Sequence, residues 1–291
     1  MKKLLSCALV AASWAAGRQV AESGHCRAAL PSLKAAITRA TDPIQKKRLG
    51  ADGIRCAMSL NDTDTAQDFV RALKKQFPRD PEVLYLAVHV FSELSLRASK
   101  DLSVIAPASY QARELNAEAL EADGKPEAAI GEYRHVLKTE PNLRGIHYRI
   151  GRLLLSGPNK EAAKDEARRE FEEELKIDPS SAAAEYVLGE LARQDQQTSP
   201  AIEHFERATK LDTGFTDAFI GLGRSLIEAN RVTDAIAPLQ AAVKLQPENP
   251  AAHLYLATAY QRAGRTEDAA REFALQAQTS GKLRSRAPTP P

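Results

Sequence analysis

Clustered carboxylates and histidines are the residues of this sequence with the greatest capacity for chemistry. Four glutamates lie within Glu170–Glu174, and grouped carboxylates serve as ligands for hard cations and as general acids or bases. No second set of ligand residues accompanies this run, so we interpret it as the solvated face of a charged helix. His147 and His253 occupy large-residue positions of helical patterns, where packing is favoured over metal binding.

The sequence also lacks the short motifs of the common enzyme classes. It has no phosphate-binding loop with Gly-Lys-Ser/Thr, no His-Glu-x-x-His, no Gly-x-Ser-x-Gly and no Cys-x-x-Cys. The pair Gly221-x-Gly223 is only a fragment of a dinucleotide fingerprint, and it sits inside a helical pattern. Polar candidates in residues 22–109 have no useful spacing: Asp52, Asp62, Asp64 and His89. We therefore predict no catalytic residue, no cofactor and no metal site.

A repeat with a period of 34 residues organises the second half of the chain. Each position of the pattern recurs with the same or a similar residue. The matched sets are Leu188, Leu222 and Leu256; Gly189, Gly223 and Ala257; Ala201, Ala235 and Ala269; and Phe205, Leu239 and Phe273. A self-similar period of this length is typical of a helical solenoid.

One repeat, Thr216–Asn249, shows why the helices must pack together. Two apolar stripes at helical spacing are separated by a turn around Asn230, and Pro247 ends the second. Each stripe predicts a helix of roughly three to four turns, which is too short to be stable alone in water. Small residues such as Gly223 allow the helix axes to approach closely. The pattern therefore predicts an all-α fold of stacked antiparallel helix pairs.

This pattern resembles the tetratricopeptide repeat. The best copy reads Phe219, Leu222-Gly223, Leu226, Ala235, Leu239, Ala242 and Pro247. In the last copy, Gln276 and Gly281 stand where Ala and Pro are usual. The resemblance implies an α-solenoid in which the first helices of successive repeats line a concave groove that holds extended peptides or helices.

The resemblance divides the chain into repeats and flanking segments. Regular repeats are predicted at 110–143, 144–181, 182–215, 216–249 and 250–278. The copy at 144–181 is longer than the others, and we expect its extra residues to lengthen the turn-rich loop Ser156–Lys160. Residues 22–109 are predicted to form a helical hairpin and divergent repeats, with a short last helix over Lys100–Ser109. Residues 279–291 are predicted to be a disordered tail.

The same geometry assigns a row of side chains to the wall of the groove. The row consists of Tyr148, Arg152, Tyr186, Glu190, Arg193, Ile220, Arg224 and Gln261. Tyr and Arg are frequent interface anchors, so the row predicts a protein or peptide partner with an acidic or aromatic-containing segment. The alternative is that these are ordinary surface residues of amphipathic helices. Glu114 and Glu118 stand where related carboxylate clamps use Lys and Asn, which argues against capture of a C-terminal carboxylate.

Residues 1–17 are predicted to be a cleavable signal peptide. Lys2 and Lys3 precede an apolar run, Leu4–Ala16, followed by small residues. The run is shorter than the roughly 20 residues that cross a bilayer, so no integral membrane span is predicted. We expect export to the periplasm or the extracellular space. The alternative is a cytosolic protein with an apolar N-terminal helix.

Removal of that segment changes the charge and the cysteine content. The formal net charge of +2 falls to zero with the loss of the two lysines, so no nucleic-acid partner is predicted. Cys26 and Cys56 remain, and both lie on apolar helical stripes. Antiparallel helices in an oxidising compartment would allow them to form a disulfide. The alternative is two unpaired cysteines in the core.

We interpret the chain as a non-catalytic scaffold that binds a protein or peptide through its concave groove. Assembly of an envelope or secreted complex is the expected setting, by analogy with exported tetratricopeptide proteins of bacteria. Two alternatives stay open. One is an enzyme-associated module with an unrecognised hydrolytic or sugar-binding site in the divergent N-terminal half. The other is a cytosolic regulatory scaffold, which requires an uncleaved N-terminus.

Overall fold

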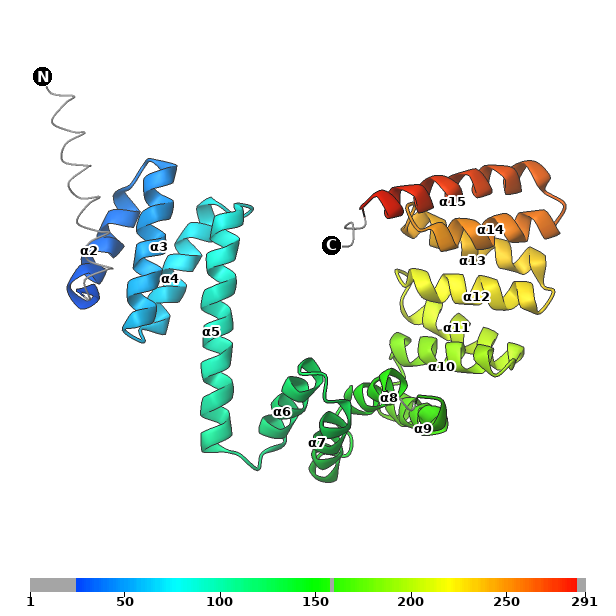
Figure 1. Ribbon diagram of the computed structural model, residues 1–291, viewed down its shortest axis with the longest axis horizontal. Coiled ribbons are helices and arrows are strands. Elements are labelled where there is room, and N and C mark those ends of the chain that lie inside the picture. The colour runs from blue at the N-terminus through cyan, green and yellow to red at the C-terminus, as the bar shows by residue number, and fades with distance from the viewer. Residues whose placement is uncertain (1–24, 158–159, 287–291) are drawn as a thin grey trace, which may run out of the picture. The chain divides into compact units, whose positions relative to one another are not determined.

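The computed structural model describes residues 25–157 and 160–286, which form fourteen α-helices and no strand (Figure 1). The chain divides into two units, residues 1–107 and 108–291, each with its own hydrophobic core. The predicted signal peptide lies outside the described residues. The all-α solenoid predicted from the repeat is confirmed.

From residue 25 onward, the N-terminal unit has four consecutive helices: α2 (Cys26–Arg39), α3 (Pro43–Ser59), α4 (Thr63–Gln76) and α5 (Pro81–Ile105). An aspartate precedes each of the last three. The side chains of Asp42, Asp62 and Asp80 accept hydrogen bonds from backbone N–H groups of the first turn. Such caps satisfy donors that have no partner within the helix. Aspartates in the sequence therefore fix where α3, α4 and α5 begin.

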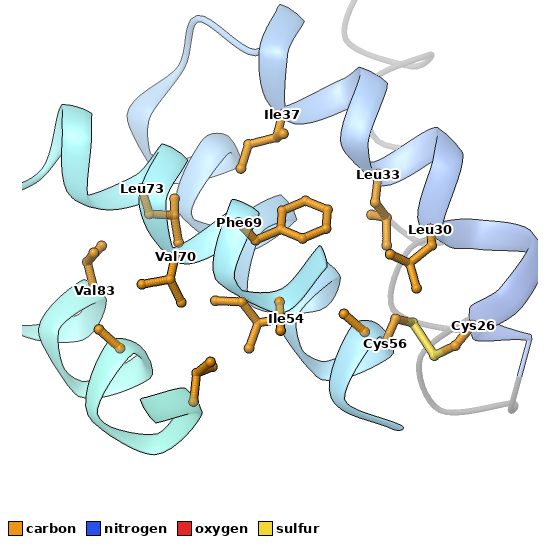
Figure 2. Close-up of a cluster of buried hydrophobic side chains, with 14 residues drawn as sticks. Cys26, Leu30, Leu33, Ile37, Ile54, Cys56, Phe69, Val70, Leu73 and Val83 are labelled. Atoms are coloured by element: carbon orange, nitrogen blue, oxygen red, sulfur yellow. A yellow bond between two sulfur atoms is a disulfide. The ribbon is translucent and has the colours of Figure 1, made fainter. Parts of the chain in front are cut away.

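The core of this unit depends on small residues in α3. A Cβ atom on Gly53 would lie 2.4 Å from the ring of Phe69, so only glycine allows α3 and α4 to pack at this distance. Figure 2 shows Phe69 inside the buried cluster that α2, α3, α4 and α5 build together. At the edge of the cluster, Cys26 of α2 and Cys56 of α3 form a disulfide, with their Cα atoms 4.9 Å apart.

Helix α5 differs from the sequence prediction. A separate short helix was expected over Lys100–Ser109, but α5 continues without a break to Ile105. The reason is local: nothing between Leu94 and Ile105 breaks a helix, and the hydroxyls of Ser99 and Ser103 donate to carbonyls one turn earlier. The helix ends where Pro107 forces the preceding residue, Ala106, out of the helical conformation.

The C-terminal unit is a run of five helix pairs. They are α6 (Tyr110–Ala122) with α7 (Pro126–Thr139), α8 (Ile146–Ser156) with α9 (Lys160–Ile177), α10 (Ala182–Gln194) with α11 (Thr198–Leu211), α12 (Thr216–Glu228) with α13 (Val232–Leu245), and α14 (Pro250–Arg262) with α15 (Thr266–Arg286). One pair falls in each predicted repeat. In each of these pairs we call the earlier helix the first helix and the later one the second helix.

Two boundaries in this unit differ from the prediction. The extra residues of the second pair were expected in the loop at Ser156–Lys160. They instead lengthen α9 at its N-terminus: α9 has 18 residues, whereas α11 and α13 have 14. Lys160, Glu161 and Lys164 are good helix formers, which favours this outcome. At the other end, α15 continues to Arg286, so residues 279–286 are helical and not part of a disordered tail.

Candidate partner-binding surface

The predicted groove residues lie on the first helices of four consecutive pairs. α10 contacts α12, and α12 contacts α14, so the first helices of the last three pairs are direct neighbours, and α8 is the first helix of the pair before them (Figure 1). We call the surface that they share the first-helix face. It is defined by Tyr148 and Arg152 on α8, Tyr186, Glu190 and Arg193 on α10, Arg224 on α12, and Gln261 on α14.

At the α8 end of the face, two arginines are held by glutamates of the preceding pair. Arg149 contacts Glu118 at 2.7 Å and Glu121 at 3.5 Å. Arg152 also forms an ion pair with Glu121. Because the pairs join α8 to α6, they connect one repeat to the next. They also mean that the charge of Arg152 is already balanced.

Two tyrosines of the face pack their rings against phenylalanine rings. The ring of Tyr148 meets that of Phe171 edge-on, with the centroids 5.6 Å apart. Tyr186 packs between Phe205 and Phe215, at 5.9 and 4.9 Å. Burial raises the pKa of Tyr186 to about 12, so its hydroxyl stays protonated over the physiological pH range. Both tyrosines are half-buried, which leaves part of each ring for contact with a partner.

The centre of the face carries two more ion pairs. Arg193 contacts Glu190 at 2.7 Å, and the hydrogen bond to Glu190 raises the pKa of the guanidinium. Arg224 contacts Glu228 at 3.0 Å and also lies over the ring of Tyr255, 5.6 Å from its centroid. The three predicted arginines therefore all have glutamate partners. The face presents aromatic rings beside balanced ion pairs, and not a patch of unpaired positive charge.

Comparison with known proteins identifies repeats in the C-terminal unit. The sequence profile of the tetratricopeptide repeat matches residues 164–214 and 220–285. These residues are tetratricopeptide repeats.

Solved structures of tetratricopeptide proteins share the fold. MamA matches with 22% identity and a TM-score of 0.53, over 62% of this chain and 98% of MamA. MamA from Desulfovibrio magneticus RS-1 matches with 21% identity and a TM-score of 0.52, over 61% and 96%. YrrB, described as a TPR protein with an unusual peptide-binding site, matches with 18% identity and a TM-score of 0.53, over 62% and 92%. No curated protein matches significantly.

One predicted position of the tetratricopeptide groove does not reach the surface. Ile220 has the same place in its repeat as Tyr186, but its exposed fraction is only 9%. It belongs to a small cluster with Ala242 and Ala252, and Tyr255 packs against that cluster. Ile220 is therefore part of the packing between α12, α13 and α14, and Tyr255 is partly exposed beside that cluster. Gln261, by contrast, is exposed as predicted.

The carboxylate run of the second repeat is only in part the solvated face that the sequence predicts, because Glu172 and Glu173 are exposed but Glu174 is buried. Glu174 is buried and accepts hydrogen bonds from the backbone N–H groups of Gly145 at 2.8 Å and Tyr148 at 3.2 Å. Gly145 directly precedes helix α8, adopts a φ of 86° and has no side chain to cap the helix. Glu174 therefore caps α8 from the neighbouring helix. Glu170 contacts His147 at 2.6 Å.

The histidines take part in pairs that recur within the repeats. His147 with Glu170, His204 with Glu185, and His253 with Glu272 each join a first helix to its second helix at 2.6 Å. These contacts fit the packing role that the sequence analysis favoured for His147 and His253. The described residues contain no group of His, Cys, Asp or Glu able to hold a metal ion. None of the described helices is long and apolar enough to cross a membrane.

Sequence reasoning missed two residues that contact Arg224 of the first-helix face. Glu228 follows Arg224 by four residues, a spacing that stabilises ion pairs on a helix and would have found it. Tyr255 has no equivalent aromatic residue in the other repeats, since Val187 and Gly221 stand in its place. No sequence signal identifies it, because its role depends on packing between α12 and α14.

Proposed function

We propose that the first-helix face binds a protein or peptide partner and that the protein acts as a non-catalytic scaffold. The observation that carries the proposal is the row of half-buried aromatic rings, Tyr148, Tyr186 and Tyr255, beside the ion pairs of Arg152, Arg193 and Arg224. Tyr and Arg are the residue types most enriched at interface hot spots. The description of YrrB as a peptide-binding TPR protein supports the same use of the fold.

Because each arginine already has a glutamate partner, the face sets requirements on the side chains of a binding segment beyond its net charge. A segment that binds here places apolar or aromatic side chains on the tyrosine rings. Its carboxylates replace Glu121, Glu190 or Glu228 as partners of the arginines, which keeps those cations paired during the exchange. An extended or helical segment with both aromatic and acidic residues meets this requirement. A purely basic segment does not.

Charge reversal on the face tests the proposal. The double variant Arg152→Glu/Arg224→Glu places carboxylates beside Glu121 and Glu228, so we expect capture of the native partner by chemical crosslinking and mass spectrometry to be lost. Both side chains are at least a third exposed, so helicity by circular dichroism should stay unchanged. Arg231→Glu, on the exposed start of the second helix α13, is the matched control. Equal capture by the double variant and the wild type would contradict the proposal.

We further propose that the protein works outside the cytoplasm, in the assembly of an envelope or secreted complex. The disulfide between Cys26 and Cys56 supports this location, because structural disulfides persist in oxidising compartments. Fractionation combined with N-terminal sequencing tests it. The expected result is an exported protein that starts near residue 18, and an intact protein in the cytosol would contradict the proposal.

A further inference from the structure

Helix α5 exposes an apolar stripe next to the face that it buries. Leu84, Val88 and Phe91 follow one another at helical spacing, and 41, 61 and 47% of their surfaces are exposed. On the buried side, Val83 and Val90 pack into the core of the N-terminal unit. An exposed row of large apolar residues on one helix marks an interaction site.

The position of α5 in the repeat pattern explains why no second helix packs on this stripe. Asp80-Pro81 begins α5 as Asn249-Pro250 begins α14, and this alignment sets the three stripe residues against His253, Ala257 and Tyr260. Those three are 2, 0 and 6% exposed, because the second helix α15 packs on α14. Helix α5 has the position of a first helix, but it is the last helix of its unit.

One side chain of the stripe is larger than the residues at its position in the other repeats. Val88 has the repeat position of Gly189, Gly223 and Ala257. A large residue of the second helix packs directly against each of the two glycines. A helix that packs on α5 must therefore present a small residue opposite Val88, or stand further from the axis of α5. The stripe is thus shaped for a helix that differs from the second helices of this chain.

Helix α4 places three basic side chains beside the stripe, and we call them the basic border: Arg71, Lys74 and Lys75. An open hollow of about 480 Å³ lies between α4 and α5. Val70 and Phe91 supply its apolar residues, and the other lining residues are Gln67, Arg71, Lys74 and Lys75. Lys74 is distinctive, because the equivalent residues of α7 and α13 are the apolar Leu137 and Val243. All the charged residues that line the hollow are basic, and Lys74 and Lys75 are exposed.

We propose that an amphipathic helix of another protein, with an acidic flank and a small residue in its apolar face, occupies this α4–α5 site in place of the missing second helix. Its apolar face covers Leu84, Val88 and Phe91. Its acidic flank faces Lys74 and Lys75, so that opposite charges meet across the interface.

The charges of this chain argue against two other occupants. Its own apolar N-terminal segment carries Lys2, Lys3 and Arg18 against the single acidic Glu22, so it has the wrong sign. A second copy that docks through α5 offers no acidic flank either, because Asp101, ten residues beyond Phe91, is the only acidic side chain of α5 outside two ion pairs. Glu82 contacts Lys47 at 3.4 Å, and Glu93 contacts Arg97 at 2.8 Å.

A pair of synthetic peptides tests the proposal on the full chain. The probe is a fluorescein-labelled helical peptide of about 18 residues with Leu and Ala on one face and Glu elsewhere, long enough to form a helix when bound. The comparison peptide has Lys in place of every Glu. We expect fluorescence anisotropy to show binding of the acidic peptide and weak or absent binding of the basic peptide.

Variants separate the border from the stripe. Lys74→Glu/Lys75→Glu should lower affinity for the acidic peptide at least about tenfold and raise it for the basic peptide. The control is Lys210→Glu/Lys244→Glu, because these two lysines have the repeat position of Lys75 on second helices whose next pair is complete. Val88→Glu should abolish binding of the acidic peptide with the helical content unchanged.

Three results would overturn the proposal. They are failure of the acidic peptide to bind, equal binding before and after reversal of Lys74 and Lys75, and a dimer in analytical ultracentrifugation that Val88→Glu dissociates. The site is independent of the first-helix face. Arg152→Glu/Arg224→Glu should therefore leave the affinity of the acidic peptide unchanged, and a loss in that variant would also contradict the assignment.

Discussion

Leu239 of α13 packs directly onto the backbone of Gly223 in α12. A Cβ atom on Gly223 would lie 2.3 Å from Cγ of Leu239. The same contact recurs with Phe171 on Gly151 and Phe205 on Gly189, each at 2.8 Å. A glycine in each of these first helices thus receives the large residue of its second helix, and this contact sets the distance between the two helices.

Filling that position should separate the two helices. We expect Gly223→Val to destabilise the protein by about 3 kcal/mol, since Leu239 and its neighbours are fully buried and close-packed. Urea unfolding followed by circular dichroism measures the change.

Gly131→Ala is the control for this experiment. Gly131 lies in helix α7 with nothing within 4 Å of its added Cβ, so alanine should stabilise the helix by roughly 0.5–1 kcal/mol. Similar effects of the two substitutions would contradict the close-approach argument.

Glu174 should matter for stability although it lies within a charged run. Glu174→Ala leaves the N–H groups of Gly145 and Tyr148 without acceptors, and an unsatisfied buried donor costs about 1–3 kcal/mol. Glu173→Ala is the matched control, because that residue is exposed on the same helix. Hydrogen exchange should accelerate at the start of α8 in the first variant only. Unchanged exchange there would show that Glu174 does not cap α8.

The disulfide should stabilise the N-terminal unit alone. Cys26→Ser/Cys56→Ser opens a loop whose cysteines are 30 residues apart, and the chain-entropy model gives a loss of about 3 kcal/mol for such a loop. Differential scanning calorimetry should show a lower melting temperature for the N-terminal unit and no change for the C-terminal unit. Reducing agent should have the same effect on the wild type and none on the variant.

The pH dependence of stability should include a contribution from Glu185. Burial raises the pKa of this carboxyl, but hydrogen bonds from His204 and Arg207 outweigh burial, and the pKa in the folded protein lies below the ordinary value of 4.5. The stabilisation is therefore present above about pH 4.5 and is lost as pH falls through the lower pKa of the folded state.

Glu185→Gln should remove this contribution. The variant should be less stable than the wild type at pH 7, and the difference should shrink as the pH falls below about 4.5. Urea unfolding at several pH values measures it, with Glu203→Gln as an exposed control on the same repeat. A difference that does not change with pH would contradict the assignment to Glu185.

The repeat fold could be predicted from sequence because its information is local and periodic. Positions such as Gly223 and Leu239 recur at a fixed step, and the recurrence itself reveals the helix pairs. The boundaries were less predictable where the repeat changes length. The extra residues near Lys160 are compatible with both a loop and a helix, and only their high helix propensity favours the extension of α9.

The candidate surface was less predictable than the fold. The position of Arg152 and Arg224 follows from the repeat, and the i,i+4 spacing also reveals the pair of Arg224 with Glu228. The pair of Arg152 with Glu121 joins two helices and depends on side-chain geometry. Ile220 shows the same limit, because its burial results from packing with Ala242 of α13 and Ala252 of α14. The function of Glu174 was hidden because a cap supplied by another helix has no fixed sequence spacing.

Hydrogen–deuterium exchange of the full chain with and without its crosslinked partner tests the central claim most directly. If the first-helix face binds the partner, protection should increase in α8, α10 and α12 around Tyr148, Tyr186 and Arg224, and should change little in the second helices α9, α11 and α13. Unchanged exchange in the three first helices in the presence of bound partner would contradict the account.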